Sequence, residues 1–134
     1  MIGLVLDTTA LVAYTNGVES VGIRIAQAAD DSLEVLVPAL CLAQAYREAG
    51  RDTFRLLDVL VQIPTIVVGP VERRHCSVLG GWSHALETLD LAQVAIEAAA
   101  YGVAPVMTTR ADLLHRVLPH AWPVIRPWAE RNRP

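Results

Sequence analysis

Apolar and polar positions alternate along this chain in blocks that predict strands separated by helices. Residues 2–6 form an almost uninterrupted apolar run, which is typical of a strand buried on both faces of a parallel sheet. Three further runs have the same β-rich apolar character, and a last short run has it more weakly. We therefore expect strands at residues 2–6, 33–37, 65–68, 105–108 and 123–126.

The segments between these strands have helical patterns and helix-type boundaries. Apolar positions recur on one side of residues 19–31, and Gly102 suits the end of a helix. Gly80 and Gly81 are expected to interrupt another helix. We predict helices at residues 10–14, 19–31, 39–49, 53–61, 71–79, 82–88, 90–101 and 111–118, a turn at residues 16–17 and a polar tail at residues 130–134.

Strands that alternate with helices predict a mostly parallel sheet with helices on both of its faces. The expected fold is therefore a three-layer α/β/α arrangement with a sheet of four to five strands. The sequence contains no internal repeat and no interdomain linker, and 134 residues suffice for one hydrophobic core. We expect a single domain over residues 1–134.

The composition excludes several classes of protein and of catalytic mechanism. Hydrophobic residues make up 53% of the chain and charged residues 19%, which excludes a disordered chain. Every basic residue is an arginine or a histidine, so mechanisms that need a lysine nucleophile or Schiff base are excluded. The formal net charge of −3 argues against a broad nucleic-acid-binding surface, although it leaves room for a local arginine patch.

No segment of the sequence predicts a membrane span, a disulfide or a zinc site. The apolar runs are shorter than the roughly 18 residues that a spanning helix needs, and no signal peptide is recognisable, so we expect a cytoplasmic protein. Cys41 and Cys76 form no CxxC motif, and Cys41 lies in an apolar helical pattern typical of a small core residue. The four histidines lack the spacing of zinc ligands.

Polar side chains follow the ends of several predicted strands. Asp7 comes directly after the first strand, Asp90 begins a helix, and residues 108–112 follow the fourth strand. Because the carboxyl ends of parallel strands meet at one edge of a sheet, we expect these residues to converge there. Carboxylates gathered in this way bind Mg²⁺ or Mn²⁺, which activate water and stabilise a phosphodiester transition state. An alternative is a structural role, in which Asp7, Thr8 or Thr9 is simply the N-cap of the following helix.

Four segments in this order resemble a PIN domain of the VapC-toxin type. They are residues 6–11 (LDTTAL), residues 37–45 (VPALCLAQA), the helix of residues 90–102, and residues 106–109 (VMTT), and together they span nearly the whole chain. The first segment is the most specific. The resemblance implies a small α/β/α PIN-like fold and an Mg²⁺- or Mn²⁺-dependent ribonuclease. It also implies RNA as substrate, a small antitoxin protein as partner, and a homodimer.

The resemblance assigns roles to three residues directly. Asp7 matches the first metal-binding aspartate of the family, and Thr9 matches its adjacent hydroxyl. Asp90 matches the third acid, although its helix is one residue longer than usual before Gly102. On this basis Asp7 and Asp90 are the expected catalytic and metal-binding residues.

Two of the four acids of the family pattern are replaced in this chain. Gln44 stands where the family usually has a glutamate, and Arg110, two residues after Thr108, stands where an aspartate is usual. These replacements move the charge of the site by about three units toward positive, which disfavours a divalent cation in a low-dielectric cleft. The sequence leaves open whether the guanidinium pairs with Asp7 or Asp90 instead.

Two further acids are candidate substitute ligands. Glu48 lies one helical turn from Gln44, and Asp112 follows the fourth strand. Each has a structural alternative, because Glu48 suits a solvated helix end and Asp112 suits a capping box with Thr109. Asp90 has the same alternative, with a glutamine three residues later.

The sequence supports two functional hypotheses. The first is an Mg²⁺- or Mn²⁺-dependent endoribonuclease in which Asp7 and Asp90 hold the metal, Thr9 orients Asp7, and Glu48 or Asp112 assists. The second is a catalytically inactive PIN-like module that holds no metal and binds a protein or RNA partner. Phospho-acceptor receivers and dehalogenase-like phosphatases also place an aspartate after the first strand. The absence of lysine excludes the former, and a threonine in place of the second aspartate excludes the latter.

Overall fold

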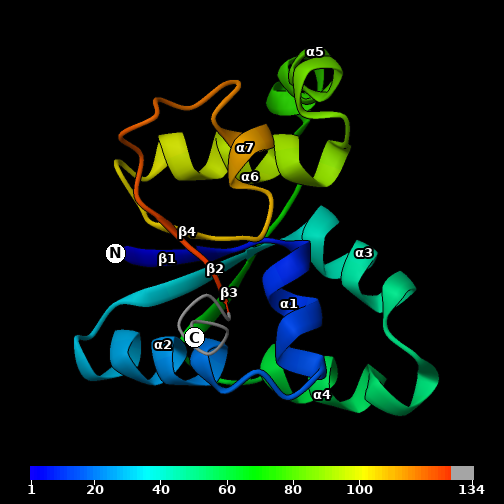
Figure 1. The fold of residues 1–134 in the computed structure, drawn as a ribbon, viewed down its shortest axis with the longest axis vertical. Coiled ribbons are helices and arrows are strands. Elements are labelled where there is room, and N and C mark those ends of the chain that lie inside the picture. Colours follow the sequence, from blue (N-terminus) through cyan, green and yellow to red (C-terminus); the bar gives the residue numbers. More distant parts are fainter. Residues whose placement is uncertain (128–134) are drawn as a thin grey trace, which may run out of the picture.

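The computed structural model describes residues 1–127, which form a five-stranded, all-parallel sheet between two layers of helices (Figure 1). Its spatial order is β3-β2-β1-β4-β5. The strands are β1 (Ile2–Leu6), β2 (Glu34–Pro38), β3 (Ile66–Gly69), β4 (Val106–Met107) and β5 (Val124–Ile125). This architecture confirms the predicted three-layer α/β/α fold class. The predicted polar tail at residues 130–134 lies outside the described residues.

Helices cover both faces of the sheet. The helices are α1 (Thr8–Thr15), α2 (Glu19–Asp30), α3 (Ala39–Glu48), α4 (Phe54–Leu60), α5 (Cys76–Leu86), α6 (Leu89–Ala100) and α7 (Ala111–Leu114), with short 3₁₀ turns at Arg51–Thr53 and Arg73–His75. α6 with α5 and α7 lies on one side of the sheet, whereas α1, α2 and α4 lie on the other, and α3 packs against both α1 and α6 (Figure 1). Among residues 1–127, no helix has both the length and the apolar content to cross a membrane.

The central strand β1 determines where the polar residues converge. The side chains of Leu4, Val5 and Leu6 are buried because helices cover both faces of the sheet. Val5 pairs with Val106 and Leu6 pairs with Met107, so Asp7 and Thr108 are the next residues beyond the paired ends of β1 and β4. The register of two neighbouring parallel strands therefore brings a carboxylate and a hydroxyl together at one edge of the sheet.

Three predictions of helix boundaries are wrong. Gly80 and Gly81 do not interrupt a helix, because α5 runs through both of them. The packing of α5 on α6, with Leu79 and Leu86 buried, outweighs the low helix propensity of two glycines. The predicted helix at residues 71–79 is a 3₁₀ turn followed by the start of α5, and α7 ends well before residue 118.

Candidate functional site

Asp7 is fully buried at the end of β1 and accepts five hydrogen bonds. Its Oδ1 accepts from the Thr9 hydroxyl at 2.6 Å and from the Ala10 backbone N–H at 3.0 Å. Its Oδ2 accepts from the Thr108 hydroxyl at 2.5 Å and from Nε and Nη2 of Arg110 at 3.3 and 3.0 Å. Asp7 is therefore the N-cap of α1, as the structural alternative predicted, and its carboxylate also contacts Thr108 and Arg110 beyond the end of β4.

Asp90 projects from the first turn of α6 toward the same place. Its Oδ2 accepts from the Thr8 hydroxyl at 2.5 Å and from Arg110 Nη2 at 3.0 Å. Thr88, not Asp90, is the N-cap of α6, and its hydroxyl accepts from the backbone N–H of Leu91 at 3.4 Å. The capping-box alternative for Asp90 is thus wrong, and its carboxylate is directed toward Thr8 and Arg110.

Arg110 joins the two carboxylates. A single nitrogen, Nη2, lies 3.0 Å from Oδ2 of Asp7 and 3.0 Å from Oδ2 of Asp90. The side chain of Arg110 is only 20% exposed, so these ion pairs are largely shielded from solvent. Its Nη1 donates to the Thr88 hydroxyl at 3.5 Å. The pairing that the sequence left open is therefore formed with both aspartates at once, and we refer to Asp7, Arg110 and Asp90 as the ion triad.

Burial and neighbouring charges shift the pKa values of Arg110 and Asp90. Burial alone lowers the pKa of Arg110, but the charges of Asp7 and Asp90 outweigh it and leave that pKa above its ordinary value. Burial alone raises the pKa of Asp90, but the hydrogen bond from the Thr8 hydroxyl, the neighbouring Thr88 hydroxyl and the charge of Arg110 leave that pKa below its ordinary value. Arg110 is thus a permanent cation, and Asp90 is ionised at neutral pH.

Threonine hydroxyls complete the cluster. Thr9 accepts at 2.8 Å from the backbone N–H of Thr109, and Thr108 accepts at 2.8 Å from the backbone N–H of Arg110. Both hydroxyls therefore donate to Asp7 while accepting from the loop after β4, which ties β1 to that loop. Every threonine hydroxyl bonded to a carboxylate here acts as the donor, as an ionised acceptor requires.

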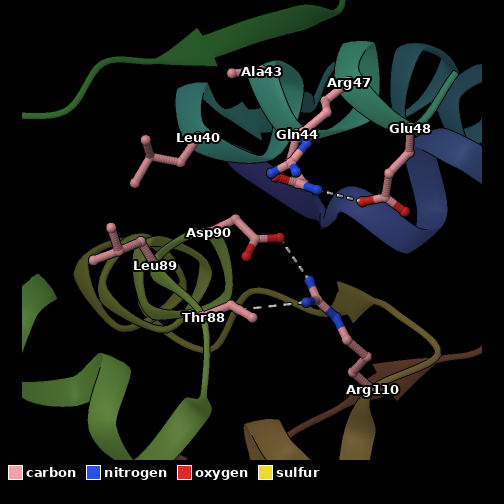
Figure 2. A pocket seen from close by; sticks show the side chains of 9 residues that line it. All are labelled: Leu40, Ala43, Gln44, Arg47, Glu48, Thr88, Leu89, Asp90 and Arg110. Carbon is pink, nitrogen blue, oxygen red and sulfur yellow. Dashed lines mark hydrogen bonds and ion pairs between the residues drawn. The ribbon is translucent and has the colours of Figure 1, made fainter.

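An open cavity of about 640 Å³ lies beside the ion triad, under α3 (Figure 2). In Figure 2, Asp90 and Arg110 point toward each other on one side of the cavity, and Gln44 and Glu48 lie on the other. Nε2 of Gln44 donates to Oε2 of Glu48 at 2.9 Å. The residues that line the cavity are Leu40, Ala43, Gln44, Arg47, Glu48, Thr88, Leu89, Asp90 and Arg110.

Glu48 and Asp112, the two candidate substitute ligands, differ in position. Glu48 is exposed and reaches the cavity, where it is bonded to Gln44. Asp112 is exposed on α7, and among residues 1–127 no hydrogen bond or ion pair joins its side chain to the ion triad. The capping box predicted for Asp112 and Thr109 is not formed either, because Arg110 occupies the N-cap position of α7 without a side-chain cap.

The residues present do not fit an Mg²⁺ or Mn²⁺ ion. Such an ion takes about six oxygen ligands, normally one or two carboxylates together with several waters. Within residues 1–127 no group of three or more histidine, cysteine, aspartate or glutamate side chains is arranged to hold a metal ion. The guanidinium of Arg110 lies between the two aspartates and binds the oxygens that a cation would need.

Cys41 borders the ion triad but is unsuited to nucleophilic chemistry. Burial raises the pKa of its thiol, and the nearby charges of Asp7 and Asp90 raise it further. Its Sγ donates to the backbone carbonyl of Asp90 at 3.4 Å. The thiol therefore stays protonated, in keeping with the predicted core position of Cys41.

Three residues of the site region have contacts that the sequence did not predict: Thr88 had no predicted role, Thr8 was only a possible N-cap, and Gln93 entered only the capping-box alternative for Asp90. Thr8 and Thr88 bond to members of the ion triad, as described above. Gln93 is buried in α6, where its Oε1 accepts from the Leu40 backbone N–H at 2.9 Å and its Nε2 donates to the Gly69 carbonyl at 3.0 Å. These two hydrogen bonds of Gln93 connect the start of α3 and the end of β3 to α6. The available signal for it was a polar residue within a largely apolar helix.

Comparisons with protein-family models, curated proteins and solved structures find no match for this chain.

Proposed function

We propose that this chain is a VapC-like PIN-type module that acts in the cytoplasm by binding a partner and does not cleave RNA with a bound metal. The observation that carries the proposal is the position of Arg110, whose Nη2 lies 3.0 Å from a carboxylate oxygen of both Asp7 and Asp90. These are the two acids that the family resemblance assigns to the metal. In this chain they already have a cation.

The charges of the ion triad support the absence of a metal. Two carboxylates and one guanidinium leave a formal charge of −1, and the acceptor oxygens nearest the guanidinium are engaged. A divalent cation placed beside a buried guanidinium would be strongly repelled, because like charges at short range are poorly screened away from water. Gln44, in the position of a third acid, supplies no compensating negative charge.

The cavity beside the ion triad supports a protein as the partner, with a small antitoxin-like protein as the form that the resemblance suggests. Its lining combines apolar side chains, among them Leu40 and the 53% exposed Leu89, with the charges of Arg47 and Glu48. Such a mixture suits a protein surface better than a phosphate backbone, which requires concentrated positive charge. The net charge of −3 points the same way. The family resemblance also suggests that the chain forms a homodimer.

A metal-dependent endoribonuclease is the second candidate function. It is favoured by the convergence of Asp7 and Asp90 at the carboxyl edge of the sheet, where α/β proteins bind their ligands. It requires the guanidinium of Arg110 to leave both carboxylates, which makes it the weaker of the two.

The experiment that tests the proposal is an RNA cleavage assay with a binding arm. We expect the wild-type chain with Mg²⁺ or Mn²⁺ to cleave a mixed-sequence RNA no faster than its Asp7→Asn variant. Metal-dependent cleavage that both chelator and the Asp7→Asn substitution abolish would establish the ribonuclease instead. Fluorescence anisotropy with the same RNA is expected to show no binding at micromolar concentration in 0.15 M salt, and salt-sensitive binding would make RNA the partner.

The protein-partner arm needs a matched pair of surface variants. Leu89→Glu alters the lining of the cavity, whereas Val103→Glu changes a residue that is 67% exposed and does not line it. We expect a partner that copurifies with the wild type and with Val103→Glu to be lost with Leu89→Glu. A partner retained by Leu89→Glu would place its binding surface elsewhere.

A further inference from the structure

We infer that Arg110 is a tethered cation that closes a latent cation site, and that removing its side chain opens this site to free cations. The inference rests on the proposed function in one respect, which is that the wild-type chain holds no metal. It goes further by assigning the closure to one side chain. It also states what the remaining residues bind once that side chain is gone.

The carboxylates keep their positions without Arg110, because other donors hold them. Asp7 retains hydrogen bonds from the Thr9 hydroxyl, the Ala10 backbone N–H and the Thr108 hydroxyl. These three donors belong to the α1 N-terminus and the end of β4, which the sheet register fixes. The first carboxylate is therefore oriented by the fold rather than by the guanidinium.

Asp90 is held in the same way. The Thr8 hydroxyl donates to its Oδ2 at 2.5 Å, and Asp90 stands in the first turn of the well-packed helix α6. Nine consecutive residues of that helix, from 90 to 98, are buried, so the helix has little freedom to carry the carboxylate away. Removal of the guanidinium would leave two oriented carboxylates close together without a counter-ion.

The place that Arg110 occupies is reachable from solvent. Its side chain lines the cavity of about 640 Å³ and is 20% exposed there. The head group reaches the carboxylates from this open side, as Figure 2 shows for Asp90. Truncation at residue 110 would therefore extend the cavity to both aspartates, and an ion from solution would have a path to them.

Covalent attachment explains why free cations do not displace the guanidinium in the wild type. A group attached to the chain has an effective concentration at its binding site in the millimolar range or above. A free ion must compete with the guanidinium at that concentration. The guanidinium also makes three hydrogen bonds to the two carboxylates. When that competitor is removed, a cation that prefers oxygen ligands, such as Mn²⁺, has two carboxylates available and can keep several waters as its other ligands.

The test uses thermal unfolding of Arg110→Ala with MnCl₂ or with 1-ethylguanidinium chloride as the added cation. Loss of the buried counter-ion is expected to lower the unfolding midpoint of the variant. Millimolar Mn²⁺ and ethylguanidinium are each expected to raise it by roughly 5 °C or more in a saturable manner, because they bind only the folded state. Wild type and the surface control Arg116→Ala are expected to show no saturable rise.

Further variants make every outcome informative. The double variant Asp90→Asn with Arg110→Ala lacks the second carboxylate and is expected to lose the Mn²⁺ effect. Arg110→Met, which fills part of the space left by the guanidinium, serves as a second variant if Arg110→Ala is unfolded. Circular dichroism then follows the folding of each variant as Mn²⁺ or ethylguanidinium is added. Folding induced by either cation supports the inference.

Two outcomes separate this inference from the proposed function. If neither Mn²⁺ nor ethylguanidinium stabilises or folds the Arg110 variants, the latent site does not exist, although the proposed metal-free function stands. If the wild type itself is stabilised saturably by Mn²⁺, the guanidinium does not close the site, and the proposed function fails as well.

Discussion

Nη2 of Arg110 lies 3.0 Å from Oδ2 of Asp7, although 103 positions separate the two residues in the chain. The parallel register of β1 and β4 makes this contact possible, because it ends both strands at the same edge of the sheet. Asp90 completes the contact from α6. An internal ion triad thus joins β1, the loop after β4 and α6 at the carboxyl edge of the sheet.

Asp7 and Asp90 are expected to differ in their importance for stability. Asp7 accepts five hydrogen bonds, whereas Asp90 accepts two. Asp7→Asn introduces an amide donor among donors, so we expect it to lower the free energy of unfolding by about 3 kcal/mol, against about 1–2 kcal/mol for Asp90→Asn. Urea denaturation of both variants measures the difference, and a larger effect for Asp90→Asn would contradict this account.

Acid is expected to weaken the ion triad through Asp90. The pKa of Asp90 is lower in the folded than in the unfolded chain, so its contribution is fully present above the unfolded value and is lost as pH falls through the folded value. The window therefore lies below about pH 4, near and under the ordinary aspartate pKa. Denaturation series between pH 6 and pH 2.5 are expected to show the wild type approaching Asp90→Asn in stability. A constant difference across that range would argue against the ion pair.

Glu97 is expected to act in the opposite direction. It is buried in α6, and burial raises its pKa above the ordinary value. The folded chain therefore holds this proton more tightly than the unfolded chain, so ionisation at neutral pH opposes folding. Glu97→Gln should raise the unfolding midpoint by a few degrees at pH 7 and have little effect near pH 3.5, as measured by calorimetry. A loss of stability at pH 7 would show that the ionised form is favoured instead.

Gly80 and Gly81 offer a test of the α5 assignment. Both glycines are exposed inside the helix, and a Cβ at either would meet no heavy atom within 4 Å apart from its chain neighbours and the backbone of its own helix. Gly80→Ala and Gly81→Ala are each expected to raise the free energy of unfolding by about 0.5–1 kcal/mol through better helix propensity. Gly102→Ala is the matched control and is expected to destabilise, because Gly102 has a φ of +81°. Destabilisation by the α5 substitutions would mean that the helix is broken there.

Patterns of neighbouring residues were sufficient to predict the first strand and the parallel sheet. The apolar run of β1 ended at Asp7, and the alternation of strands and helices indicated the parallel sheet that brings Asp7 near Asp90 and Arg110. The continuity of α5 was missed because it depends on packing against α6, which outweighs the glycines that act locally.

The detailed bonding of the site was beyond sequence reasoning for a similar reason. Whether Arg110 pairs with Asp7, with Asp90 or with neither depends on side-chain geometry at the meeting point of two strands and a helix. The sequence suggested Asp90 as the N-cap of α6, whereas the structure has Thr88 there. The carboxylate of Asp90 is instead paired with the guanidinium of Arg110. Gln93 was missed because its partners lie on β3 and α3.

The most direct test of the central claim is a crystal structure of the wild-type chain grown in millimolar MnCl₂, with anomalous diffraction data collected for manganese. We predict guanidinium density from Arg110 in contact with Asp7 and Asp90, and no anomalous peak between the two carboxylates. A manganese peak bound to both aspartates, with the Arg110 side chain displaced into the cavity, would contradict the account.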